Sequence, residues 1–515
     1  MKTTTKTTHG EGRFLNILTA CWTKTVREGR EDRDARLRLL LADRLGVDEQ
    51  MVGALLEGFE VLATYAVGGI DDGDVLGEEE NALHASREAV RPVFEARLQQ
   101  RLSRIDEAVP LVRCARCNEM AVSEGLRTRS WLSQFGTIRA RRRYNGCKPC
   151  GCGRMLAQER VGLGDGMYTP RLAESITKLA TVVPHAMAVE LTSSLLGAEI
   201  SVHGVEELVK ERAAFVEARA AEEAETLDPW DDKGLQRPII RPADAVREAP
   251  DVAYMETDGV IVMTRREDPE RAVPAPPGSR GGKGRRYELE GREVKNAIVY
   301  RGDDCARESE TRGCLLDKRY VSYLGGWREF AKRVWPTLLR ERFDQARLRV
   351  VLSDGSEWIR LLCAWFPFTV LMILDLFHVK HRIWEVAQAL HRDDEAARAE
   401  WARAQIARVE AGEGSAVIEA LRFVKPRGET ARKLVDDLGT YLANNLDRMD
   451  YPRYRAMGLR VGSGAIESSN YHVTGARLKM QGMRWSEAGA ADMAQLRAEL
   501  FNRNWRARTR DMMAA

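Results

Sequence analysis

One stretch of this 515-residue chain alternates apolar strands with helices in a fixed order. Strands are predicted at 252–263, 295–300 and 319–323, followed by a helix at 327–347, a strand at 348–353, a helix at 357–365 and a strand at 369–374. A strand that returns through a helix to a neighbouring strand builds a sheet with helices packed on its faces. The order βββαβαβ therefore predicts a mixed α/β domain.

Two aspartates fall on the strands of this segment. Asp258 lies inside the first strand and Asp354 ends a later one, and each is followed by glycine. Neighbouring strands can bring two carboxylates to one point, and Glu467 would add a third from a late helix. Singly, these residues have ordinary explanations, because Asp-Gly favours turns and a glutamate stabilises the start of a helix.

Three carboxylates at one point suit a pair of divalent cations. Mg²⁺ and Mn²⁺ prefer oxygen ligands, and two such ions about 4 Å apart can activate an attacking water or hydroxyl and stabilise the leaving oxygen of a phosphodiester. The predicted catalytic residues, which are also the predicted ligands of two Mg²⁺ or Mn²⁺ ions, are Asp258, Asp354 and Glu467.

Five of the nine cysteines lie close together upstream of this domain. Two Cys-x-x-Cys pairs flank a stretch, 130–144, that is predicted as a β-hairpin with its turn at Gly136. This spacing is typical of a zinc ribbon, although small buried cysteines are the other interpretation. The predicted zinc ligands are Cys114, Cys117, Cys147 and Cys150, with Cys152 as an alternative fourth ligand.

Several segments have features of DNA-binding elements. Helices at 190–196 and 201–213, separated by Gly197, have helix-turn-helix proportions, and they are either a DNA-reading pair or ordinary packed helices. For 477–485 the alternative to contact with a DNA end is a solvated helix face with a packed tryptophan. The predicted DNA-binding residues are Arg139, Arg141, Arg142, Arg143, Arg477, Lys479, Arg484 and Trp485. A further basic group is Arg280, Lys283, Arg285 and Arg286.

The composition of the chain excludes some classes of protein but does not identify a binding partner. The net charge is only +3, so the whole-chain balance does not indicate nucleic-acid binding. No signal peptide is evident and no apolar run reaches about 20 residues, so no membrane partner and a cytoplasmic, nucleoid-associated location are predicted. The predicted regions are 1–108 (helical), 109–155 (zinc-ribbon-like), 156–218 (helix-turn-helix-like), 219–250 (linker), 251–378 (first part of the α/β core), 379–460 (all-α insertion) and 461–505 (final core helices).

Over residues 110–505 the sequence resembles a known family, the bacterial insertion-sequence transposases of the Kra group, which are relatives of the Mutator-like superfamily. The residues that carry the resemblance are Thr-Asp258-Gly, Leu-Ser-Asp354-Gly-Ser-Glu-Trp, Asp375-Leu-Phe-His378, Gly-Ser-Gly-Ala-Ile-Glu467-Ser, Arg477-Leu-Lys-Met-Gln-Gly-Met-Arg-Trp485 and, upstream, Arg143-Tyr-Asn-Gly-Cys-Lys-Pro-Cys-Gly and Val161-Gly-Leu-Gly.

The resemblance implies a multidomain α+β protein with a ribonuclease-H-like catalytic core, for which βββαβαβ is also the expected strand order. It implies a DDE transposase that binds terminal inverted repeats and cuts and joins double-stranded DNA as a homodimer or higher oligomer. Asp375 and His378 match the family's (Cys/Asp)-x-x-His element, near the site, either arranging DNA or supporting the sheet. The alternatives are a structure-specific nuclease on the same scaffold, without strand transfer, and a domesticated regulator that binds DNA without catalysis.

Overall fold

The structure, a computed structural model, describes residues 30–68, 75–245, 247–267, 287–307 and 313–514. The basic group at 280–286 and Cys21 lie outside these residues. The chain is a mixed α+β protein that divides into two compact units, one formed by 1–180, 185–208 and 506–515, the other by 181–184 and 209–505. No helix in the described ranges is long and apolar enough to span a bilayer.

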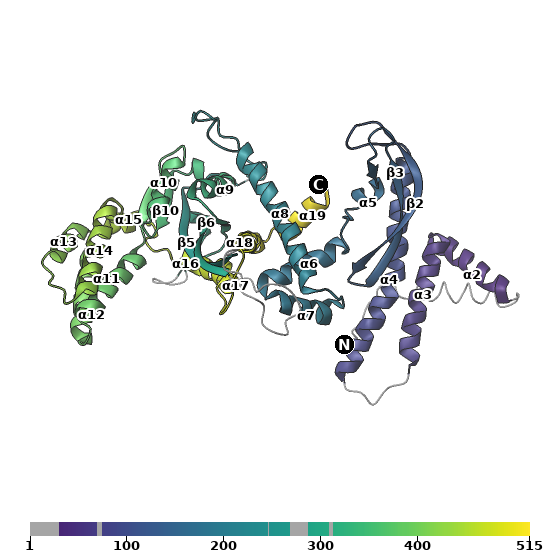
Figure 1. The fold of residues 1–515 in the computed structure, drawn as a ribbon, viewed down its shortest axis with the longest axis horizontal. Coiled ribbons are helices and arrows are strands. Elements are labelled where there is room, and N and C mark those ends of the chain that lie inside the picture. Colours follow the sequence, from purple (N-terminus) through teal and green to yellow (C-terminus); the bar gives the residue numbers. More distant parts are fainter. Residues whose placement is uncertain (1–29, 69–74, 246, 268–286, 308–312, 515) are drawn as a thin grey trace, which may run out of the picture. The chain divides into compact units, whose positions relative to one another are not determined.

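The first unit begins with a helical hairpin (Figure 1). Helices α3 and α4 pack closely where Gly58 meets the backbone of Ala89, since a Cβ at Gly58 would lie 2.3 Å from the Ala89 carbonyl oxygen. Short strands follow, then further helices. The bounds are α2 Arg30–Leu45, α3 Glu49–Val67, α4 Val75–Ala108, β1 Val112–Arg113, β2 Met120–Ser133, β3 Gly136–Gly146, β4 Gly153–Arg154, α5 Leu156–Arg160, α6 Pro170–Val182, α7 His185–Leu196 and, at the carboxyl end, α19 Trp505–Ala514.

The sheet of the first unit has the antiparallel order β1-β2-β3-β4. Its long central hairpin confirms the predicted turn, with Ser133 opposite Gly136, whose φ of +92° suits glycine. Trp131 and Ile138 face each other across the hairpin and are buried with Leu102 of α4. The apolar residues of the hairpin thus fix it against the long helix.

The second unit contains a five-stranded sheet of order β11-β10-β5-β6-β9. β5, β6 and β9 are antiparallel neighbours, whereas β10 runs parallel to β5 and β11 parallel to β10. Helix α8, Val202–Thr226, begins in the first unit and continues into the second from residue 209. The other bounds are β5 Val252–Glu267, β6 Tyr287–Arg301, β7 Cys305–Arg307, β8 Gly313–Leu315, β9 Arg319–Leu324, α9 Trp327–Arg340, β10 Leu348–Ser353, α10 Glu357–Trp365 and β11 Leu371–Leu374.

Alternate residues of the strands enter two separate cores, because side chains along a strand point to opposite faces. Ala253 and Met255 of β5 pack with α9 and α10, and this core includes Trp335. Tyr254 lies on the other face, in a core shared with the helices that follow β11. Glu256 and Asp258 have the same parity as Tyr254, so β5 directs them toward that second face.

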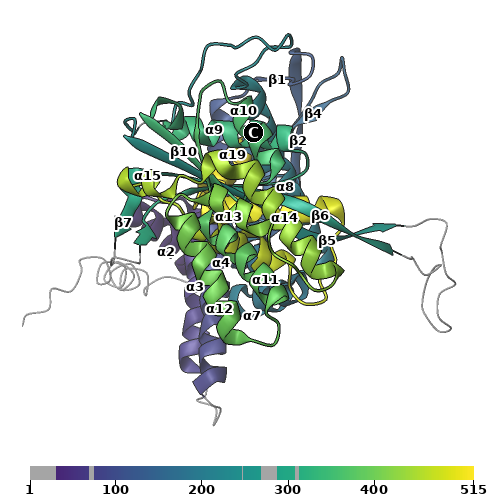
Figure 2. The ribbon, with the colours of Figure 1, turned by 90° about the vertical axis from the view of Figure 1, so that its left-hand side faces the viewer.

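The helices of residues 376–445, α11 to α14, pack on one another and form a group of their own within the second unit (Figure 1), which faces the viewer in Figure 2. Val379, Ile383 and Val386 of α11 are buried in the core that also contains Val417 and Leu442. The chain then returns to the sheet through short helices. The bounds are α11 Leu376–Leu390, α12 Glu395–Glu410, α13 Gly414–Leu421, α14 Glu429–Asn445, α15 Tyr451–Ala456, α16 Gly464–Ser469, the π-helix Asn470–Gly475, α17 Ala476–Leu478 and α18 Glu487–Phe501.

Two predicted boundaries differ from the structure. The helix predicted to end at 213 continues as α8 to Thr226, inside the predicted linker, because its Ala-, Glu- and Arg-rich sequence favours helix throughout. The helix predicted over 327–347 ends at Arg340, and Arg342 then takes a left-handed conformation with φ +55° before β10.

Candidate functional site

The strand register brings Asp258 and Asp354 to the same edge of the sheet. β5 and β10 are parallel, with Leu352 opposite Glu256, and two residues further on each strand lie Asp354 and Asp258. Gly355, with φ +91°, turns the chain away at that point, and a Cβ there would lie 2.8 Å from a methyl carbon of Leu374. The two predicted aspartates are therefore neighbours, as parallel strands require.

Asp258 is half-buried and held at both carboxylate oxygens. The backbone N–H of Gly259 donates to Oδ1 at 2.7 Å, and Nδ2 of Asn470 donates to Oδ2 at 2.7 Å. Burial, together with the charge of Asp354, raises the pKa of Asp258 to about 6. A carboxyl group that resists ionisation in the metal-free chain is one that a divalent cation would stabilise.

This raised pKa predicts that Asp258→Asn makes the metal-free protein more stable at neutral pH. The folded chain binds the Asp258 proton more tightly than the unfolded chain, whose pKa is near 3.8, so stability falls as pH rises from about 4 to about 6. Above pH 6 the free energy lost by ionising Asp258 in the folded chain no longer changes with pH. Asparagine at this position cannot ionise, so the Asp258→Asn variant does not lose it. We expect a gain of about 1–2 kcal/mol in the free energy of unfolding at pH 7.5 in EDTA.

Denaturant unfolding of both proteins at pH 7.5 and at pH 4 measures this gain. It should shrink toward zero at pH 4, where aspartate is protonated in the folded chain. An equal difference at the two pH values would contradict the assignment of Asp258 as a buried carboxyl with a raised pKa.

Asp375 is fully buried at the start of α11 and joins three segments. Its carboxylate accepts from the N–H groups of Phe377 and His378, both at 3.1 Å, and from the N–H of Ser463 at 2.9 Å. It also contacts Nδ1 of His378 at 2.5 Å. The hydrogen bonds of His378 and Ser463 outweigh burial and lower the pKa of Asp375, so the group is an anchored carboxylate.

His378 is hydrogen-bonded to Asp375 and interacts electrostatically with the two strand aspartates. Its pKa is raised, chiefly by the hydrogen bond to Asp375 and also by the negative charges of Asp258 and Asp354. A raised pKa favours the imidazolium form, which places a positive charge beside the two carboxylates. Asp375 thus orients His378 in addition to capping α11.

Removal of Asp375 should destabilise the second unit strongly. Asp375→Ala leaves three backbone N–H groups without their acceptor, and we expect the free energy of unfolding to fall by roughly 3–5 kcal/mol. Asp394 offers a matched control, because it caps α12 from an exposed position with one bond to Ala397. Asp394→Ala should cost about 1 kcal/mol. Denaturant unfolding followed by tryptophan fluorescence measures both, and equal losses would contradict the buried anchoring role.

Glu467 projects from α16 as an exposed side chain. Ligand atoms of Asp375, His378 and Glu467 all lie within 4.8 Å of one another, and in the described part of the chain this is the carboxylate-containing set that could hold a metal ion. Asp258 and Asp354 lie beside His378 but outside this set.

The donor chemistry differs between the two possible ligand sets. Asp375 already accepts four hydrogen bonds, and a metal ion there would displace groups that cap α11. Asp258, Asp354 and Glu467 offer carboxylate oxygens, two from half-buried strand residues and one from an exposed helix residue, and such oxygens suit Mg²⁺ or Mn²⁺. By donor type the three predicted acids fit Mg²⁺ or Mn²⁺, although among the described residues the ligand atoms of Glu467 are grouped with those of Asp375 and His378 and not with those of the two strand aspartates.

Two residues at this site were missed by sequence reasoning. Asn470 donates to Asp258 and lies one helical turn after Glu467, a spacing that could have drawn attention to it. Glu256 is completely buried and lies two residues before Asp258, so it shares the same face of β5. Its carboxyl accepts from the Tyr300 hydroxyl at 2.5 Å and from the Ile466 N–H at 2.9 Å, and burial raises its pKa.

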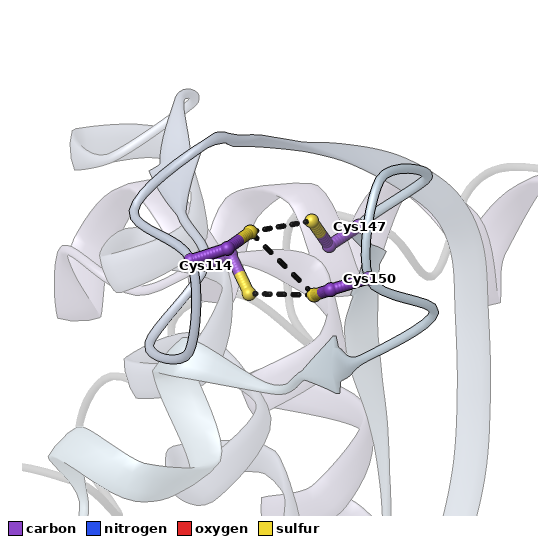
Figure 3. Close-up of side chains that lie close together, drawn as sticks. Cys114, Cys147 and Cys150 are labelled. Carbon is purple, nitrogen blue, oxygen red and sulfur yellow. Dashed lines mark hydrogen bonds between the residues drawn. The ribbon is translucent and has the colours of Figure 1, made fainter.

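The cysteine cluster forms a second candidate metal site, in the first unit. The loop between β1 and β2 carries two of the thiols and the loop between β3 and β4 the other two, and their sulfurs point toward one another (Figure 3). Three of the Sγ–Sγ distances are 3.4–3.5 Å, and no pair is a disulfide. The thiols whose sulfurs all lie within 4.8 Å are Cys114, Cys117, Cys147 and Cys150.

This arrangement fits a tetrahedral zinc ion. Four thiolates at the usual Zn–S distance would have sulfurs about 3.8 Å apart, close to those observed. Backbone N–H groups of Cys117 and Arg116 lower the pKa of Cys114 to about 6, whereas burial and the neighbouring thiols raise the pKa of Cys147, so Cys114 is the thiol that ionises first. Cys152 lies outside this set, and its Sγ is 3.8 Å from the Arg116 guanidinium. The four candidate ligands are therefore the cysteines of the two Cys-x-x-Cys pairs.

The four arginines of β3 divide by exposure. Arg139 and Arg141 are exposed, whereas Arg142 is buried against Trp131 and hydrogen-bonded to Gln158, and burial lowers its pKa. Arg143 is half-buried and donates to the backbone oxygen of Asp106 at 2.7 Å. Arg142 thus lies on the inner face of the strand rather than on the DNA-facing surface expected from its neighbours.

The basic residues after Glu467 divide in the same way. Lys479 and Arg484 are exposed. Arg477 is 1% exposed and stacks on the Trp485 ring at 4.7 Å, and burial lowers its pKa to about 10. Trp485 also bridges the backbone of β5 at Thr264 and donates from Nε1 to the Leu478 oxygen. For Arg477 and Trp485 the structure therefore has the packed arrangement.

A scan against protein-family models finds no match for this chain, and a search of curated proteins finds none either. The family resemblance noted in the sequence is thus an expectation that the site chemistry must support.

Proposed function

We propose that the second unit is a ribonuclease-H-like catalytic core and that the protein is a DDE transposase. The observation that carries the proposal is that Asp258 and Asp354 lie on or just after neighbouring parallel strands and interact electrostatically with His378. His378 in turn lies within 4.8 Å of ligand atoms of Asp375 and Glu467. The strand order β11-β10-β5-β6-β9, with only β5, β6 and β9 antiparallel, supports the same conclusion.

In this mechanism the chain supplies ligands and orientation. Asp258, Asp354 and Glu467 would hold two Mg²⁺ or Mn²⁺ ions. When bound, these ions supply activation of the attacking oxygen and stabilisation of the leaving oxygen of a phosphodiester. Asp375 holds His378 in place, and the His378 proton partly neutralises the two strand aspartates before cations bind.

DNA contacts are assigned to exposed basic side chains. Arg139 and Arg141 on β3 suit phosphate contacts by the first unit, and Lys479 and Arg484 lie on the segment that follows Glu467. Duplex DNA would be recognised at the terminal inverted repeats by residues 110–215. Because transposition must join two ends, we propose a homodimer or higher oligomer.

The test uses the full-length protein and duplex DNA from the flanks of its coding region. Fragments with labelled 3′-OH ends are incubated with supercoiled plasmid in Mg²⁺, Mn²⁺ or EDTA. A transposase should cleave at the element ends and move label into the plasmid, in the presence of either cation and not in EDTA. Cleavage without transfer of label would indicate a nuclease instead. If neither cleavage nor transfer occurs, the remaining interpretation is a regulator that binds DNA without catalysis.

A further inference from the structure

A buried chain of polar side chains runs from β9 to Asp258. The Ser322 hydroxyl donates to Oδ1 of Asn296 at 2.5 Å, and Nδ2 of Asn296 donates to Oδ1 of Asn470 at 2.8 Å. Nδ2 of Asn470 then donates to Oδ2 of Asp258 at 2.7 Å. Ser322, Asn296 and Asn470 are 7%, 3% and 9% exposed, so water competes little for these bonds.

The Asp258 carboxylate at the end of this series of side chains determines which group donates in each hydrogen bond. An ionised carboxylate only accepts, so Asn470 must present its NH₂ group to Asp258 and its oxygen to Asn296. Asn296 must in turn present its NH₂ group, whose second hydrogen bond goes to Oγ1 of Thr474 at 2.9 Å. Its oxygen then remains for the Ser322 hydroxyl. Rotation of the Asn470 amide would place oxygen against carboxylate, which disfavours any other arrangement.

The same chain fixes the helix that carries Glu467. Asn470 follows α16 directly and bonds to β5 through Asp258. On the other side of Glu467, the Ile466 N–H donates to Glu256, which also belongs to β5. β5 therefore holds this short helix at two points that flank Glu467, and both points involve carboxylates on one face of the strand.

We propose that Asn470 is a positioning residue for binding a divalent cation. It orients the Asp258 carboxylate and sets the position of Glu467, three residues earlier in the chain, relative to it. The inference rests on the proposed function. Mg²⁺ requires nearly ideal octahedral geometry, so a carboxylate with both oxygens held in place binds it better than a rotating one. Groups that hydrogen-bond to metal ligands typically change metal affinity by about 10–100-fold when removed.

The test measures Mn²⁺ binding to the full-length, DNA-free protein by electron paramagnetic resonance of free Mn²⁺. Binding to this site is defined as the part lost in Asp258→Asn. Asn470→Ala should weaken it by about 10-fold. In DNA cleavage, the Mg²⁺ concentration for half-maximal rate should rise similarly, with a smaller effect in Mn²⁺, since Mn²⁺ tolerates irregular geometry better. If Asn470 had only a structural role, Asn470→Ala would lower stability but leave both the Mn²⁺ affinity and the half-maximal Mg²⁺ concentration of the folded protein unchanged.

Asn502→Ala is the matched control, because Asn502 pairs with the backbone of Tyr320 on β9 and does not contact the acids. It should leave Mn²⁺ affinity within twofold of the wild type. If Asn470→Ala does not fold, Asn470→Ser replaces it with the same expected weakening, since serine is too short to reach Asp258.

The outcomes separate the two proposals. Mn²⁺ affinity of the folded Asn470 variants within twofold of the wild type would overturn the positioning role even if the wild type transposes DNA. Absence of Mn²⁺ binding that depends on Asp258 would overturn it as well. A wild type that binds Mn²⁺ as expected, and loses affinity in Asn470→Ala, but does not cleave DNA would retain the positioning role and refute the proposed function.

Discussion

Asp258→Asn, Asp354→Asn and Glu467→Gln should each lower the rate of Mg²⁺-dependent DNA cleavage and joining by about 10³-fold or more. Each change keeps the size of the side chain but removes the charge that a cation requires. All three carboxylates act on the same ions, so the effects should not add. The triple variant should be about as slow as the slowest single variant.

Cleavage and strand-transfer rates on labelled DNA ends, at equal DNA occupancy, measure these effects. Asp251→Asn is the control, because Asp251 lies just before β5, is exposed and pairs with Arg347 away from the site. It should leave the rates unchanged. A folded single variant with the wild-type rate would remove that residue from the catalytic set.

The second large effect concerns zinc. The purified protein should contain about one Zn²⁺ per chain, and Cys117→Ser should lose it, together with the structure of the two loops that carry the thiols. Binding of a structural zinc ion contributes on the order of 10 kcal/mol in small zinc domains, far more than the few apolar residues around these loops can supply. Only Cys114, Ala121 and Cys147 are described as buried in that small core.

Cys152→Ser is the matched control for this prediction. Cys152 follows Cys150 by two positions, but its sulfur lies outside the four-thiol set. Elemental analysis should find the wild-type zinc content in Cys152→Ser and almost none in Cys117→Ser, with faster proteolysis in the two cysteine loops of Cys117→Ser. Equal zinc in both variants, or none in the wild type, would contradict the site.

Which basic residues are exposed could be predicted from the sequence for β3 but not for the segment after Glu467. Ile138, Ala140 and Arg142 alternate along β3 and are buried together, while Arg139 and Arg141 face outward. The period of two was available from the sequence, and the apolar Ile138 indicated which phase faces inward. Arg477 gave no such signal, because its burial depends on Trp485 and on a β5 strand far away in the chain.

The sequence by itself determined the strand and helix order of the second unit, the two aspartates on or just after neighbouring strands and the two Cys-x-x-Cys pairs. These depend on local periodicity and spacing, which the chain carries residue by residue. Tertiary structure alone decided that Glu467 lies beside Asp375 and His378, that Cys152 is left out, and that Asn470 and Glu256 join α16 to β5. Such contacts connect residues up to about two hundred positions apart, and only packing of the whole sheet brings their atoms within hydrogen-bonding distance.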